Sequence, residues 1–318
     1  TTSLGLGTVQ ISAGMAHIFG IEETFTNKVY IIIFITLLGL TSVSLGLNAG
    51  IKKLSQLNMI IATGLLLLVF ILGPTIFIVN ALVQNFGAYL NTIIQSATWT
   101  EVYDPSSWQN GWTLFYFTWW FSWAPFVSLF IARISYGRTI KEFIVGVLFV
   151  PSLIVFLWMG VFGNAAIYQV ISNTSDISQV VANNLPVALF TLYDVYPFAK
   201  ALSIVSLILI ITFFVTSSDS GALVASMLSS KDQSDINDDS PMISRVTWAV
   251  LLGIVAAVLL YAGGLTALQT SVVITGVPFA IIMVFACKNL LKGLRESDDS
   301  PPRHINTCLL YTSPSPRD

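Results

Sequence analysis

Residues 112–132 read WTLFYFTWWFSWAPFVSLFIA, a run of 21 residues without a charged side chain. A helix of about 20 apolar residues is long enough to cross the hydrocarbon core of a bilayer. The chain holds seven further apolar stretches: 2–20, 28–47, 57–83, 143–164, 199–228, 243–262 and 265–291. The first of these begins with the chain, so we interpret it as the end of a longer segment. The sequence therefore predicts an all-α integral membrane protein with about eight transmembrane helices, seven of them whole. Gly73–Pro74, Pro125, Pro151 and Pro278 mark candidate kinks in these helices.

The composition supports this class and excludes several others. The chain is 55% hydrophobic and 9% charged, whereas soluble domains carry about 25% charged residues. The net charge of −2 gives no reason to expect a nucleic-acid partner. Two cysteines and two histidines cannot form a disulfide framework or a metal cluster. We therefore expect no resident cofactor.

The positive charges predict how the chain is oriented, because cytoplasmic connections are richer in Lys and Arg. If the connection 48–56 is cytoplasmic, the C-terminal end of the last helix is cytoplasmic too. The long polar connections 84–111 and 165–198 then lie outside, and connections of that length usually carry structure or a function. Ten cations fall on the cytoplasmic side and two, Lys28 and Lys200, on the other; the ten are Lys52, Lys53, Arg133, Arg138, Lys141, Lys231, Arg245, Lys288, Lys292 and Arg295.

The tryptophans of the run 112–132 lie deeper than membrane tryptophans usually do. Trp112 fits the common place of tryptophan at the membrane interface. At about 1.5 Å per residue, Trp120 lies roughly 12 Å deeper, near the middle of the bilayer. Phe115, Trp119 and Trp123 are spaced by four and are expected to share a helix face, and Tyr116, Trp120 and Trp123 form the adjacent stripe. Aromatic faces bind a quaternary ammonium without adding a formal charge. The alternative is that these rings pack against neighbouring helices.

A second unusual stretch, TSSDSG at 216–221, lies inside the apolar run 199–228. It places four hydroxyl groups beside Asp219, the only carboxylate within the apolar runs. A carboxylate inside a membrane is by default a functional candidate, and hydroxyl oxygens suit a hard cation such as sodium. The alternative is that each hydroxyl donates a hydrogen bond to a carbonyl one turn earlier.

Four stretches carry a resemblance to a known family. These are WTLFYFTWWFSWAPFVSLFIARISYGRTIKEF at 112–143, TSLGLGTVQ at 2–10, LNMIIA…GPT at 57–75 and FFVTSSDSGALV at 213–224. In this order they resemble the betaine/choline/carnitine transporter family, over nearly all of 1–295. The resemblance implies a LeuT-type inverted-repeat fold with twelve transmembrane helices, of which 112–291 would form the complete second repeat. Residues 1–83 would end the first repeat, and 1–306 would be one membrane transport domain.

The resemblance also implies roles for the aromatic residues. Trp120 matches the tryptophan that stacks on the trimethylammonium group of the substrate. Trp119 and Trp123 match its neighbours along the pathway to the cytoplasm, and Phe115 matches a gating aromatic residue on the outer side. Phe117 departs from the pattern, because relatives often have tryptophan there.

For the coupling ion, the resemblance implies a sodium site formed by Thr216, Ser217 and the carbonyl of Phe213. Sodium-independent exchangers of the family are expected to replace the ion with an arginine, and this chain has no Lys or Arg between 54 and 132. Sodium coupling is therefore favoured, and proton coupling stays open. Asp219 is expected to be a structural polar residue that braces the nearby backbone.

Taken with these residues, the resemblance implies a multi-pass secondary transporter of the bacterial inner membrane and not an enzyme. Its substrate would be a trimethylammonium solute, with glycine betaine preferred over choline or carnitine, and its partners would be membrane lipid and two further copies in a homotrimer. The alternatives are a proton-coupled choline transporter and, in another class, a passive channel-like protein. Dependence of uptake on an ion gradient would separate a transporter from a channel.

The two ends of the sequence are unusual. The chain does not begin with methionine, so we expect helices to be missing before residue 1. Residues 308–318, CLLYTSPSPRD, resemble the translation of a transposase adapter used in sequencing libraries. We therefore expect them not to be native and exclude them from the fold.

Overall fold

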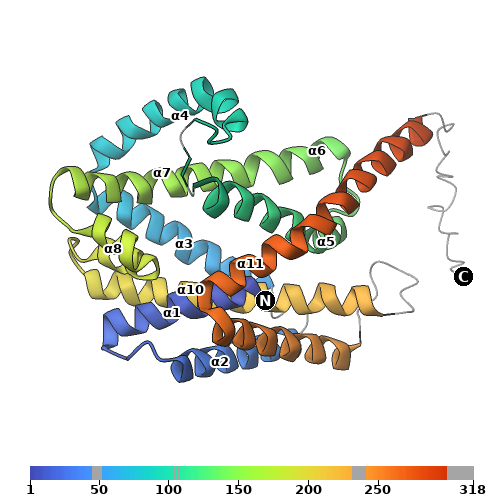
Figure 1. The fold of residues 1–318 in the computed structure, drawn as a ribbon, viewed down its shortest axis with the longest axis horizontal. Coiled ribbons are helices and arrows are strands. Elements are labelled where there is room, and N and C mark those ends of the chain that lie inside the picture. Colours follow the sequence, from blue (N-terminus) through green and yellow to red (C-terminus); the bar gives the residue numbers. More distant parts are fainter. Residues whose placement is uncertain (45–51, 104, 107, 231–240, 299–318) are drawn as a thin grey trace, which may run out of the picture.

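A computed structural model of the chain describes residues 1–44, 52–103, 105–106, 108–230 and 241–298. The prediction about 308–318 lies outside these residues. The regular elements of the described residues are all helices (Figure 1). Its longer helices are α1 (Thr2–Phe19), α2 (Phe25–Ser44), α3 (Lys52–Leu72), α4 (Thr75–Thr98), α5 (Phe115–Ile134), α7 (Val150–Ile171), α10 (Ala199–Ser229) and α11 (Met242–Asp298). The shorter ones are α6 (Ile140–Ile144), α8 (Ile177–Asn183), α9 (Ala188–Tyr193), the π-helical turns η2 (Gln109–Leu114) and η3 (Val145–Phe149), and the 3₁₀ turn η4 (Leu185–Val187).

Seven described stretches are long and apolar enough to cross a membrane. They confirm the predicted class of an all-α membrane protein. The longest, Met242–Glu296, is 55 residues long, which is far more than the roughly 20 residues that one crossing needs. It is interrupted at Gly263 and Gly264, whose backbone angles are not helical. The interruption falls between the predicted segments 243–262 and 265–291, so α11 contains both of them.

The segment predicted to cross the membrane at 57–83 is instead two helices, and this boundary was wrong. Helix α3 ends at Leu72, and α4 begins at Thr75 after Gly73 and Pro74. Pro74 has no N–H group to donate to the carbonyl of Phe70. The Thr75 hydroxyl donates to that carbonyl instead, at 2.7 Å. The predicted polar connection 84–111 was also wrong in its first part, because α4 continues to Thr98.

The other prolines that marked candidate kinks behave differently. Pro125 and Pro278 lie inside α5 and α11, which continue past them. Pro151 directly follows the π-helical turn η3 and lies within the uninterrupted helical stretch Ile140–Ile171, which also continues past it.

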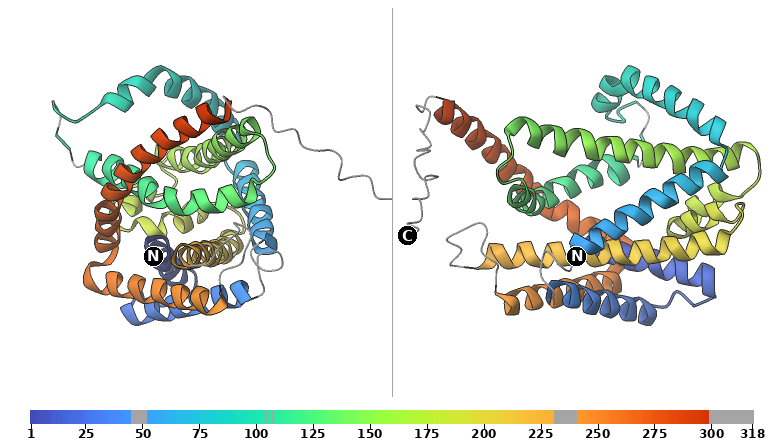
Figure 2. Two further views of the ribbon diagram at one scale, coloured as in Figure 1. Left: turned by 90° about the vertical axis from the view of Figure 1, so that its right-hand side faces the viewer. Right: turned by 180° about the vertical axis from the view of Figure 1, so that it is seen from behind.

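Helix α10 belongs to both hydrophobic cores of the molecule. One core joins α3 and α7 to α10 through buried residues such as Leu65, Val161 and Leu202. The other joins α1, α2 and α11 to α10 through residues such as Ile11 and Val215. Seen along the bundle, α10 lies between α1 and α3 (Figure 2, left). The fold is therefore organised around α10.

Helix α1 packs closely because its glycines leave room for neighbouring side chains. A Cβ atom on Gly5 would lie 2.5 Å from Leu268 of α11, and one on Gly7 would lie 2.3 Å from Phe214 of α10. Small residues at helix contacts are typical of membrane proteins, where they let helices approach one another. The GLG pattern in TSLGLGTVQ thus has a packing role in this structure.

Candidate functional site

Helix α5 is attached to α11 along one face. Thr118 fits against Gly276, where a Cβ atom would lie 2.6 Å from the threonine. Four residues later, the Ser122 hydroxyl donates to the carbonyl of Val272 at 3.2 Å. Because residues four apart share a helix face, these contacts fix how α5 is turned.

The four predicted substrate-binding side chains form two groups on α5. The rings of Phe115 and Trp119 lie 5.2 Å apart, and Phe115 is buried. Trp120 and Trp123 form a separate edge-to-face pair at 5.4 Å. They are 56% and 43% exposed, so both indoles present free surface. The spacing placed Trp123 on both predicted stripes, and in the structure its ring contacts Trp120 of the second stripe.

A cage needs rings on more than one side of its ligand. In the described chain, every ring that contacts one of these four side chains comes from the stretch 112–123. The arrangement is thus a one-sided aromatic strip on α5, and the exposed indoles of Trp120 and Trp123 could contact one side of an organic cation.

The predicted sodium ligands lie in the middle of α10. The Thr216 hydroxyl donates to the carbonyl of Phe213 at 2.8 Å, so these two oxygens are adjacent. This is also the hydrogen bond to a preceding carbonyl that the alternative interpretation of the hydroxyl cluster expects. Ser217, the third predicted ligand, is exposed.

Asp219 lies one turn further along α10 and is only 1% exposed. It packs against α2, where a Cβ atom on Gly39 would lie 2.8 Å from Oδ1 of the carboxyl group. Its Oδ2 atom has no hydrogen-bond partner among the described residues. The structure thus places Asp219 at the contact between α2 and α10.

Sequence reasoning missed a cavity of about 350 Å³ between α1, α3, α7, α9 and α10. We call it the aromatic cavity. Phe213 lines it, which connects it to the predicted sodium ligands, and the stacked rings of Trp158 and Phe162 lie 4.5 Å apart in its wall. The spacing of these two residues by four inside the run 143–164 was the available signal. The full lining is Gln10, Leu65, Trp158, Phe162, Leu189, Tyr193, Ser206, Leu209, Ile210, Phe213 and Phe214.

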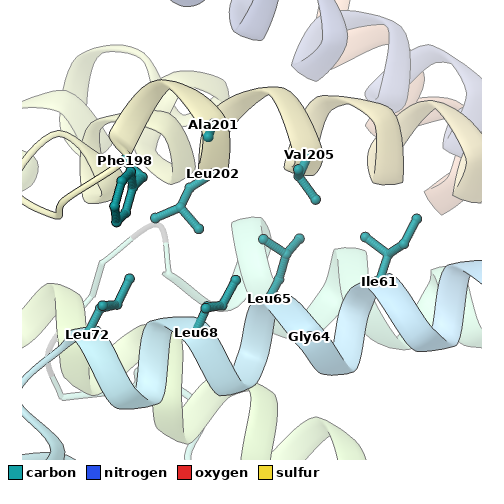
Figure 3. A pocket seen from close by; sticks show the side chains of 9 residues that line it. All are labelled: Ile61, Gly64, Leu65, Leu68, Leu72, Phe198, Ala201, Leu202 and Val205. Atoms are coloured by element: carbon teal, nitrogen blue, oxygen red, sulfur yellow. The ribbon is translucent and has the colours of Figure 1, made fainter.

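A second cavity, of about 400 Å³, lies between α3 and α10 (Figure 3). Its walls are aliphatic except for Phe198, and they include Leu65, Leu68 and Leu202. None of its lining side chains carries a hydrogen-bonding group. A zwitterionic solute would lose its hydration there without replacement, so this cavity does not suit a charged substrate.

Comparison with known proteins places these features in a family. Residues 1–299 match the family model described as betaine/carnitine/choline family transporter. The chain is 41% identical over 295 residues to a glycine betaine transporter of Acinetobacter baylyi, which covers 92% of this chain and 44% of that protein. It is 43% identical to a glycine betaine/proline/choline transporter of Vibrio parahaemolyticus, covering 93% of this chain and 52% of the relative.

A third relative is the glycine betaine transporter OpuD of Bacillus subtilis, 39% identical over 92% of this chain and 56% of that protein. The chain thus spans about half the length of the curated relatives it matches. Members of the matched family are transporters and not enzymes. From the family match over residues 1–299 and the membrane helices described above, the chain belongs to the betaine/carnitine/choline family of membrane transporters.

Proposed function

We propose that this chain contributes the second repeat of a transporter that takes up glycine betaine together with sodium. The observation that carries the proposal is the Trp120–Trp123 pair, whose indoles are exposed near the middle of α5 while the opposite face of the helix is anchored on α11. An indole face attracts a quaternary ammonium through its quadrupole. Three relatives named above bear glycine betaine in their names, which supports this solute over carnitine.

Sodium coupling is supported by the adjacent oxygens of Thr216 and Phe213. Oxygen ligands of this kind suit a hard cation. In such a transporter, one group of helices would rock against the other so that the site opens to each side in turn. The bias of positive charges supports an orientation in the bacterial inner membrane with the end of α11 in the cytoplasm. By analogy with the family, the assembled protein would be a homotrimer.

The test is uptake of radiolabelled glycine betaine into proteoliposomes by a full-length transporter that carries these residues. We expect Trp120→Leu to raise the half-saturating betaine concentration about 2- to 30-fold, which corresponds to the roughly 0.5–2 kcal/mol of one cation–π contact. The matched control is Trp112→Leu, because among the described residues the Trp112 ring, in η2, stacks only on Tyr116, at 6.2 Å. Trp112→Leu should leave the half-saturating concentration unchanged.

Two results would contradict the proposal. Equal half-saturating betaine concentrations for Trp120→Leu and the unmodified protein would show that Trp120 does not bind the substrate. Betaine entry at the same rate with and without an inward sodium gradient would contradict sodium coupling, and entry without a sodium or a proton gradient would indicate a passive pore.

A further inference from the structure

The aromatic cavity described above has rings on several sides. Five of its eleven lining residues are aromatic, and they come from three separate elements. Trp158 and Phe162 belong to α7, Tyr193 to α9, and Phe213 and Phe214 to α10. The strip on α5 lacks this property, because its rings all come from one stretch of the chain. The aromatic cavity therefore meets the requirement for a cage within the described residues.

Three of these rings are held in place by contacts of their own. The rings of Trp158 and Phe162 stack on one another at 4.5 Å, and Phe162 is buried. The Phe214 ring lies over Gly7 of α1, where a Cβ atom would come within 2.3 Å of it. Side chains that are already fixed lose little conformational entropy when a ligand binds. The walls of the cavity are thus prepared for a ligand before it arrives.

The lining carries no formal charge, and this restricts what the cavity can hold. None of the described residues that line it is Asp, Glu, Lys, Arg or His. A solute with a net charge would lose its hydration there without an opposite charge to replace it. A quaternary ammonium group is stabilised differently, because aromatic faces attract it through their quadrupoles. The lining therefore favours a solute whose own charges cancel and whose positive group is methylated.

The polar side chains of the lining are hydrogen-bond donors that suit a carboxylate. Gln10 of α1 is half-buried, and its side-chain amide makes no hydrogen bond within the described part of the chain. The Tyr193 and Ser206 hydroxyls lie 2.8 Å apart, and a single O–H group is enough for the bond between them. Burial raises the pKa of Tyr193 to about 12, so the phenol keeps its proton. The Gln10 amide and one hydroxyl therefore remain able to donate to a bound carboxylate.

We propose that the aromatic cavity is a second binding site for a zwitterionic quaternary ammonium solute, separate from Trp120 and Trp123 on α5. The trimethylammonium group lies among the five rings, and the carboxylate accepts a hydrogen bond from Gln10. The volume of about 350 Å³ is at the lower end of the range for ligand pockets, which suits a small solute. The identity of the solute as glycine betaine rests on the proposed function, whereas the preference for a methylated zwitterion rests on the lining alone.

The chain expressed by itself provides a direct test, because it holds every residue of this lining. The purified chain in detergent is dialysed to equilibrium against radiolabelled glycine betaine. We expect saturable binding that approaches one betaine per chain. Trp158→Leu should weaken this binding about 2- to 30-fold, the effect of losing one cation–π contact. Absence of saturable binding by the unmodified chain would refute the second site.

Phe162→Leu and Phe156→Leu form a matched pair on α7. Both substitutions remove one ring from the same helix, but Phe156 packs against Phe86 of α4 at 5.8 Å and does not line the aromatic cavity. Phe162→Leu should weaken betaine binding, and Phe156→Leu should leave it unchanged. An equal loss in both variants would show that betaine binding depends on the stability of α7 and not on the cavity, and would overturn the proposal.

A competing solute tests the chemistry of the cavity without any substitution in the chain. 3,3-Dimethylbutanoate has the shape and the carboxylate of glycine betaine, but a carbon atom replaces the charged nitrogen. It should displace labelled betaine at least about tenfold less well than unlabelled betaine does, because it offers the rings no positive charge. Equal displacement by the two compounds would show that the cavity accepts any apolar group of this shape, and the cage would be disproved.

The second site and the proposed function fail in different ways. Betaine binding by the chain that Trp120→Leu weakens and Trp158→Leu does not would place the solute on α5, which overturns the second site and leaves the proposed function intact. Absence of betaine uptake by the unmodified full-length transporter would overturn the proposed function. The dialysis experiment would still decide whether the aromatic cavity binds a methylated zwitterion.

Discussion

Thr212 and Thr216 are identical side chains on α10, and only Thr216 belongs to the predicted sodium site. Both hydroxyls donate to carbonyls in the preceding turn, Thr212 to Ile208 at 3.0 Å and Thr216 to Phe213 at 2.8 Å. Thr212 also donates to the carbonyl of Leu209 at 3.0 Å, and both Leu209 and Phe213 line the aromatic cavity. The two threonines differ in that only Thr216 belongs to the predicted sodium site. The pair therefore offers a matched test of the ion site.

We expect Thr216→Ala to raise the sodium concentration needed for half-maximal betaine uptake about tenfold or more in a full-length transporter. A lost interaction with a charged group costs about 1.5–3 kcal/mol, and about 1.4 kcal/mol is a factor of ten. Thr212→Ala removes the same kind of hydrogen bond and should leave the sodium dependence unchanged. An equal effect of both substitutions would indicate that the hydroxyls only stabilise the helix.

At this scale the sequence predicted part of the site. Spacing by four identified the Phe115–Trp119 contact, because helical periodicity fixes which residues are neighbours. It also placed Trp120 and Trp123 together on the adjacent stripe, but it did not decide which stripe Trp123 joins, because the direction of an exposed indole depends on its rotamer. The cavity around Trp158 was missed for a related reason, since it is built from five elements whose packing no local pattern specifies.

The helices themselves illustrate what hydropathy can and cannot locate. The break in α11 was predicted because Gly263 and Gly264 interrupt two apolar stretches. Gly73 and Pro74 were predicted to kink one continuous apolar run, whereas in the structure they separate two helices, α3 and α4. Apolar composition predicts burial in lipid, whereas the geometry of the chain at a proline depends on which donor replaces its missing N–H group.

The glycine break gives a prediction about stability. Gly264 has φ 58° and ψ −136°, a conformation that other residues adopt only with strain of about 1–3 kcal/mol. Gly264→Ala should therefore lower the free energy of unfolding of the chain in detergent by a similar amount. Gly293→Ala, at a helical position in the same element with open space around it, should be neutral or slightly stabilising. Thermal unfolding followed by circular dichroism measures both, and equal midpoints would contradict the prediction.

At the scale of the whole molecule, α10 connects two hydrophobic cores and carries two candidate features. Leu202 and Leu209 belong to one core, and Leu207 and Val215 to the other. The predicted sodium ligands and one wall of the aromatic cavity both lie on this helix. A displacement of α10 would therefore change both of them together.

The exposed indoles on α5 give a prediction about the chain expressed by itself. Trp120 and Trp123 present large free surfaces, and the chain spans about half the length of its relatives. We expect the isolated chain to enter the membrane of a bacterial host and to show no betaine uptake above background, with a full-length transporter as the positive control. Saturable, sodium-dependent uptake by the isolated chain would show this prediction to be wrong.

The short break inside α11 also affects how the protein is made. Only Gly263 and Gly264 separate its two apolar halves. During synthesis, the second half therefore reaches the insertion machinery directly after the first. No polar loop between them has to be carried across the bilayer, where exposed backbone groups would lack partners. We therefore expect the two halves to integrate together as a helical hairpin, with both of its ends remaining on the side where the ribosome works.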